Sequence, residues 1–149
     1  EQHSIDTSET HRRKQLIADH LPELEKKINQ EQIDRYARVS GDFNPIHVDP
    51  EYAANTDYGQ TIAHGMLTLA FVSEMMFANF FEAWIKGGKL RARFKGPVFP
   101  GDTLTTFGTL KSSTVMEQST WLEYTVGCMN QRGETVISGD AKVEVPSKT

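Results

Sequence analysis

The segment from residue 65 to residue 84 constrains the fold more than any other, because it is apolar on nearly every side of a helix. A helix of this kind in a globular protein is normally wrapped by other elements. His64, Glu74, Asn79 and Glu82 would rarely be tolerated together inside a bilayer. We therefore expect a buried central helix over residues 65–84 and no membrane insertion.

From residue 89 onward the pattern changes to that of β-strands. Alternating or Thr-rich segments predict strands over residues 90–94, 104–110, 121–129 and 136–145. Turn-forming residues separate them at 100–102 and 130–133. We expect these strands to pair in antiparallel order.

Short elements precede the long helix. Residues 23–28 are typical of a short strand. Asn29 is expected to cap a helix that Gly41 ends, and Gln32 to complete an approximate capping box. This order of elements predicts an α+β fold in which a curved antiparallel sheet wraps one long central α-helix.

Length and composition indicate one soluble domain. The chain has 149 residues, of which 38% are hydrophobic and 24% charged. Residues 1–18 are expected to form a polar, flexible tail, and residues 19–149 the domain. The formal net charge of -4 gives no electrostatic reason to expect a nucleic-acid partner.

The cysteine count and the N-terminus bear on the compartment. A single cysteine, Cys128, leaves no internal disulfide framework and suits a reducing compartment. It is expected to be a plain strand residue. The first residues show no basic-then-apolar signal pattern, so a cytoplasmic location is expected.

The run Asp42-x-Asn44-Pro45-x-His47 is the first candidate for chemistry. Pro45 prevents the preceding helix from continuing, so this run is expected to be a non-helical loop that the Asn44 side chain braces. A carboxylate and an imidazole this close can hold one water and exchange protons with it. From spacing alone, an aspartate and a histidine on a loop are more often cap and surface residues.

The second candidate is the start of the long helix, where His64, Gly65 and Met66 follow one another. The first N–H groups of a helix have no partner within it and favour negative charge. With Gly65 in place, a ligand could approach the backbone closely, and an enolate oxygen could be held there. Alternatively, Gly65 only allows a tight entry into the helix and His64 is structural.

Four short runs of the sequence together resemble one known family. They are 36–47 (YARVSGDFNPIH), 49–50 (DP), 64–66 (HGM) and 94–102 (FKGPVFPGD). They are similar to the MaoC-like, or hydratase 2, family of (R)-specific enoyl-CoA hydratases. The resemblance covers about residues 22–146 and leaves only the N-terminal tail outside.

The resemblance implies a single hot-dog fold, in which an antiparallel β-sheet wraps a long central α-helix. It implies a homodimer or a dimer of dimers, with active sites near the interface. The substrate would be an acyl-CoA or an acyl-carrier-protein thioester, with no metal or further cofactor.

The resemblance also assigns roles to individual residues. Asp42 and His47 would form the general acid/base pair on the water. Supporting or oxyanion roles fall to Asn44, which would orient the pair, to the Gly65 N–H, which would polarise the thioester carbonyl, and to Ser73. His64 and Met66 would contact the substrate.

Three functions remain open on these grounds. The first is reversible syn hydration of trans-2-enoyl thioesters to (R)-3-hydroxyacyl thioesters, which includes 3-hydroxyacyl-ACP dehydration. The second is a hot-dog acyl-CoA thioesterase with Glu74 as its carboxylate. The third is a non-catalytic subunit. The intact Asp42 and His47 favour the first.

Overall fold

A five-stranded antiparallel sheet forms one layer of the computed structural model, which describes residues 17–147. The strands are β1 (Glu25–Lys27), β2 (Lys89–Phe94), β3 (Thr103–Val115), β4 (Ser119–Met129) and β5 (Thr135–Pro146). Their order across the sheet is β1-β3-β4-β5-β2. The strands expected from the sequence are all present, and β3 is longer than expected.

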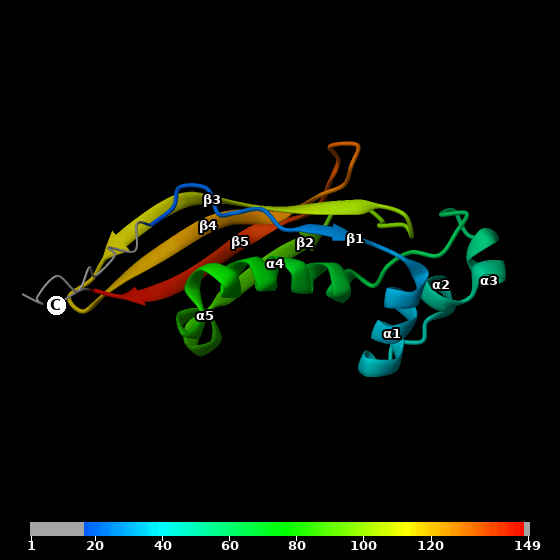
Figure 1. Cartoon of the computed structure of the whole chain (residues 1–149), viewed down its shortest axis with the longest axis horizontal. Helices are drawn as coiled ribbons and strands as arrows, with labels where there is room; N and C mark the ends of the chain where they lie inside the picture. Colours follow the sequence, from blue (N-terminus) through cyan, green and yellow to red (C-terminus); the bar gives the residue numbers. More distant parts are fainter. Residues whose placement is uncertain (1–16, 148–149) are drawn as a thin grey trace, which may run out of the picture.

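The long helix α4 (Gly65–Phe80) lies along one face of this sheet (Figure 1). It buries one face in the core, namely Leu67, Thr68, Phe71, Val72, Met75 and Met76. The strands complete the core with alternate residues such as Leu122, Tyr124 and Val126 of β4. The expected α+β, hot-dog arrangement of a sheet packed on a central helix is thus confirmed.

The long helix is shorter than the expected span of 65–84. It ends at Phe80, and a second helix, α5, follows over Glu82–Gly87. Phe81 between them has φ 47° and ψ -123°, a conformation that residues with a Cβ rarely adopt. The apolar pattern continues through Phe81, so it gave no sign of this break.

Helix α1 (Gln30–Ser40) begins and ends at the expected caps. The Asn29 side chain accepts a hydrogen bond from the Gln32 N–H at 2.8 Å, and Gly41 adopts the left-handed conformation at φ 77°. The expected capping box is wrong, however. The Gln32 Oε1 atom is buried without a partner among the described residues, so it does not return a bond to the cap.

The run over residues 42–47 is a loop only in its first half, which corrects the expectation: residues 42–44 are non-helical, as expected, but residues 45–47 are helical. Pro45 starts a new helical turn, α2 (Pro45–Val48), with Asn44 as its cap. A proline is favourable at this position because the first N–H of a helix has no partner in any case. Helix α3 (Pro50–Ala54) follows, and these short helices lie beyond one end of the sheet (Figure 1).

The N-terminal segment can be followed only in part. Of the tail expected over residues 1–18, residues 1–16 lie outside the described residues. Further along, the Tyr124 hydroxyl donates a hydrogen bond to the Ala18 carbonyl at 2.9 Å.

No helix within residues 17–147 is long and apolar enough to cross a membrane. Cys128 is buried on β4, where burial raises the pKa of its thiol to about 12.

Candidate active site

His47 lies in the single turn of α2, and its ring is fixed through one nitrogen. Nδ1 is 2.8 Å from the carbonyl oxygen of Ile62. A carbonyl oxygen only accepts hydrogen bonds, so Nδ1 carries the proton and donates it. In the neutral ring, Nε2 therefore keeps its lone pair and can take a proton from a water molecule.

Asp42 lies in the non-helical segment between α1 and α2, beside His47 of α2. Its Oδ1 accepts a hydrogen bond from the Asn44 N–H at 3.2 Å, and the residue is exposed to solvent. Three side chains meet here: Asp42, His47 and His64 each place a carboxylate oxygen or ring nitrogen within 4.8 Å of those of the other two. At such a separation, one water can hydrogen-bond to both the carboxylate and the imidazole.

Asn44 shapes this pair through the backbone. Its Oδ1 accepts a hydrogen bond from the Ile46 N–H at 3.1 Å, which caps α2. Its own carbonyl accepts a hydrogen bond from the His47 N–H at 2.9 Å. The side chain thus braces the turn, as expected, and it acts on His47 by starting the helix that carries it.

His64 lies behind His47 and is buried. Its Nε2–H donates to the main-chain carbonyl of Asp42 at 2.9 Å, and its ring stacks on that of His47 with centroids 3.9 Å apart. Its burial lowers the pKa of the imidazole, an effect opposed by the bond to Asp42 and reinforced by the neighbouring His47. His64 does not line the pocket described next, so the structure offers no direct support for the predicted substrate contact.

A pocket of about 530 Å³ opens beside His47. It is mostly apolar, and its lining includes Ile62, Gly65, Met66, Phe94, Lys95 and Val98. Gly65 is the first residue of α4, so its N–H has no acceptor within the helix and lies at the positive end of the helix dipole. The pocket therefore combines an acid/base residue with a helix N-terminus at which negative charge is stabilised.

The absence of a side chain at Gly65 matters to this pocket. A Cβ atom built there would lie 2.8 Å from Cε1 of Phe94, which is closer than real Cβ contacts. A glycine thus allows the Phe94 ring to pack directly on the start of α4. The structure shows the tight packing expected of Gly65, and it places this residue in the lining of the pocket.

Ser73 is not brought to the pocket. Its hydroxyl accepts a hydrogen bond from the Trp84 Nε1–H at 2.9 Å, which joins α4 to α5. Glu74, the candidate carboxylate of a thioesterase, forms an ion pair with Lys26 of β1 at 2.7 Å. Neither residue lines the pocket with His47.

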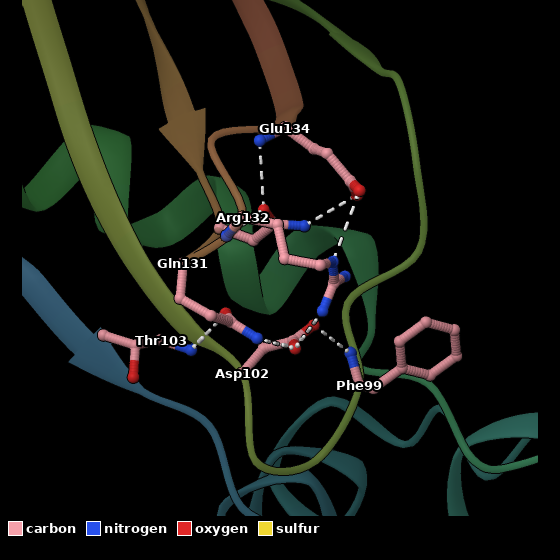
Figure 2. Close-up of polar contacts among 7 residues, drawn as sticks. Phe99, Asp102, Thr103, Gln131, Arg132 and Glu134 are labelled. Carbon is pink, nitrogen blue, oxygen red and sulfur yellow. Dashed lines mark hydrogen bonds and ion pairs between the residues drawn. The ribbon is translucent and has the colours of Figure 1, made fainter.

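One wall of the pocket is anchored by a network that the sequence did not reveal (Figure 2). The buried Asp102 accepts hydrogen bonds from the Phe99 N–H at 2.9 Å and from Gln131 Nε2 at 2.7 Å. Arg132 lies 3.5 Å from the same carboxylate. This network fastens the loop after β2 to the turn between β4 and β5. The same loop pairs with the residue before His64, because the Ala63 N–H donates to the Val98 carbonyl at 2.8 Å.

Asp42, His47 and His64 are also close enough to be considered as metal ligands. Nδ1 of His47 and Nε2 of His64 are hydrogen-bonded to carbonyl oxygens, so Nε2 of His47 and Nδ1 of His64 would be the ligand atoms. The two rings are nearly parallel, at 28°, so their in-plane lone pairs do not converge on one point.

Comparison with known proteins gives a consistent result. Residues 13–130 match the sequence profile of the MaoC like domain. The chain is 32% identical to the (R)-specific enoyl-CoA hydratase of Rhodospirillum rubrum, over 84% of this chain and 85% of that protein. It is 30% identical to the mitochondrial 3-hydroxyacyl-[acyl-carrier-protein] dehydratase of Arabidopsis thaliana, over 80% and 71% of the two chains.

A solved structure agrees with these sequence matches. The (R)-hydratase from A. caviae involved in PHA biosynthesis superposes with a TM-score of 0.72 at 29% identity, covering 84% of this chain and 93% of that one. The fold and these matches define a hot-dog protein of the hydratase and dehydratase class. The chain belongs to the MaoC-like dehydratase family.

Proposed function

We propose that this protein catalyses the reversible syn hydration of trans-2-enoyl-CoA to (R)-3-hydroxyacyl-CoA, with Asp42 and His47 acting together on the water. The chain is a hydro-lyase of the (R)-enoyl-CoA hydratase and 3-hydroxyacyl-thioester dehydratase type. The observation that carries the assignment of residues is that Asp42 and His47 can share one water beside a pocket that contains the N-terminus of α4.

The reaction divides into two bond-forming events. Asp42 and His47 remove a proton from the water, and its oxygen bonds to Cβ of the enoyl group. The electrons of the double bond move toward the thioester carbonyl, whose oxygen gains negative charge. The Gly65 N–H at the start of α4 stabilises this enolate. The pair then delivers one proton to Cα, so that a complete water molecule has been added.

A thioesterase is a weaker candidate for a structural reason. Such an enzyme would need a carboxylate near the thioester carbonyl, and Glu74 was the candidate for it. Glu74 is paired with Lys26 and is absent from the lining of the His47 pocket. The Asp42 and His47 pair supplies what hydration needs and is not required for hydrolysis.

The carrier of the acyl group is the second half of the proposal. We infer CoA because the relative from Rhodospirillum rubrum, which this chain matches over most of both lengths, is named for that substrate. Dehydration of an acyl-carrier-protein thioester is the alternative, which the Arabidopsis thaliana relative favours. Comparing crotonyl-CoA with the crotonyl thioester of an acyl carrier protein decides between them through kcat/KM.

An absorbance assay tests the reaction itself. Incubation with crotonyl-CoA should remove the absorbance of the conjugated thioester without releasing free thiol, and chiral analysis should find the (R)-3-hydroxy product. Thiol release without hydration would indicate a thioesterase. No turnover with any enoyl chain length on either carrier would indicate a non-catalytic subunit.

A further inference from the structure

His64 contacts both members of the proposed catalytic pair, although it does not line the pocket. Its Nε2–H donates to the main-chain carbonyl of Asp42, and its ring stacks on that of His47. We propose that His64 is a positioning residue that fixes Asp42 and His47 relative to each other, so that both meet the same water. This role rests on the hydratase function proposed above.

The bond to Asp42 ties an exposed segment to the core. Asp42 follows the end of α1 and is exposed, whereas His64 is only 2% exposed and precedes the first turn of α4. The 2.9 Å hydrogen bond between them therefore anchors the main chain of Asp42 to the element that also provides the Gly65 N–H. The carboxylate and the start of α4 are thus held in one frame.

The stacking contact restrains the ring of His47 in a second direction. The bond from Nδ1 to Ile62 holds one edge of that ring, and the face of His64 lies against it with centroids 3.9 Å apart. Tyr36 packs against His64 in turn, with ring centroids 4.7 Å apart. A ring held at one edge and one face presents Nε2 in a fixed direction, and catalytic rates are sensitive to such placement.

Packing alone does not account for a histidine at this position. Nδ1 of His64 is buried and has no hydrogen-bond partner among the described residues, which is unfavourable. An apolar ring of similar size would fill the same space without that penalty. The distinctive contribution of histidine is therefore the Nε2–H donor that reaches Asp42. Burial lowers the pKa of His64, which favours the neutral ring beside His47.

Two substitutions separate the donor from the ring. His64→Phe keeps a stacking ring and removes the donor, whereas His64→Gln keeps an amide donor and removes the ring. With crotonyl-CoA, we expect His64→Phe to lower kcat by about 100-fold, the scale of a small misplacement, with KM little changed. His64→Gln should recover about tenfold of that loss, the worth of one hydrogen bond. A matched control, His20→Gln, alters an exposed histidine on another segment and should keep wild-type kinetics.

Double variants show whether His64 acts through the pair. When His47→Gln has removed the catalytic ring, His64→Phe should lower kcat little further, because groups that act as a unit are not additive. Multiplicative losses, or a folded His64→Phe enzyme with wild-type kcat, would overturn the proposal. If His64→Phe does not fold by circular dichroism, the His64→Gln single and double variants, which keep a donor and remove the ring, apply the same additivity test to the stacking contact.

The wild-type protein serves as the reference that keeps the two proposals apart. If it does not hydrate crotonyl-CoA or any other enoyl thioester, the proposed function itself fails. If it hydrates the substrate but the variants behave multiplicatively, only the role of His64 fails.

Discussion

Asp42 and His47 are the residues on which the proposed chemistry depends. Each places one side-chain atom within 4.8 Å of the other, a separation that one water can bridge. Asp42→Asn and His47→Gln retain size and hydrogen bonding but remove the ability to exchange protons. We expect each to lower kcat for crotonyl-CoA by about 10²–10⁴-fold, the usual contribution of one general acid or base.

Stability measurements separate this effect from unfolding. Asp42 is exposed and His47 is half-buried, so both variants should melt close to the wild-type temperature. Glu117→Gln, in the turn between β3 and β4, is a charge-removing control that should keep full activity. Near-normal kcat in either folded active-site variant would contradict the role of that residue.

Gly65 is the second residue whose replacement has a defined outcome. In Gly65→Ala, the new Cβ would meet Phe94 Cε1 at 2.8 Å, so the half-exposed Phe94 ring must move. Both residues line the pocket, and the displaced ring should narrow it. We expect a higher KM and a lower kcat for crotonyl-CoA, measured by steady-state kinetics.

The cost to stability of this change should be modest. Overpacking a well-filled site costs about 1–3 kcal/mol, and the exposed Phe94 ring can give way, which favours the lower end. Gly87→Ala is the control, because nothing lies within 4 Å of a Cβ at that glycine near the end of α5. Unchanged kinetics in Gly65→Ala would mean that the ring moves away from the pocket.

At the scale of residues, the sequence indicated which residues lie together better than it indicated their contacts. Asp42, His47 and Gly65 lie in runs that resemble a known family, and the structure brings all three to one region. The stacking of His64 on His47 joins residues 17 positions apart and leaves no local pattern. The sequence around Ser73 gives no sign that its hydroxyl bonds to Trp84, because that bond depends on the break after α4.

The loop after β2 depends on a carboxylate that belongs to no element. Asp102 accepts from the Phe99 N–H with one oxygen and from Gln131 with the other. Asp102→Asn offers only one accepting oxygen and loses the charge that Arg132 faces. Hydrogen bonds to a charged group contribute about 1.5–3 kcal/mol, so we expect urea unfolding to report a loss of that size.

The same substitution should affect substrate binding. The loop supplies Val98 and Lys95 to the pocket, and Val98 also holds the residue before His64. We expect KM to rise in Asp102→Asn. Glu134→Gln alters only the exposed end of the network and should change neither stability nor KM appreciably. Equal effects of Asp102→Asn and Glu134→Gln on stability and KM would contradict the predicted role of the buried Asp102 carboxylate.

At the scale of elements, the sequence predicted types well and boundaries less well. Strands followed from alternation, and α1 from its caps, because those signals are local. The end of α4 did not follow from a local signal, since Phe81 adopts a positive φ without being a glycine. The turn α2 was missed because Pro45 indicated only that a helix cannot continue through it, whereas it starts a new helical turn. Tertiary packing decides such cases.

At the scale of the whole molecule, the layer arrangement followed from one long apolar helix and a series of strands. Neither the strand order nor the position of β2 was predictable, because pairing between distant strands leaves no local pattern. In the sheet, β2 is an edge strand that pairs only with β5 among the described elements. Its second edge therefore presents unpaired backbone groups over six residues.

A second copy of the chain that pairs along β2 would satisfy those groups, and we expect a homodimer. Light scattering should give roughly twice the monomer mass of 16.8 kDa.

Hydrogen exchange tests the interface itself. In an isolated edge strand, every second N–H of Lys89–Phe94 faces solvent and exchanges fast. In the predicted dimer, consecutive amides of β2 should all be protected, and diluting the protein until it dissociates should restore the alternation. A dimer in which β2 still shows alternating protection would place the interface elsewhere. The next surface to test would then be the exposed Phe77 of α4, Ile85 of α5 and Phe81 between the two helices.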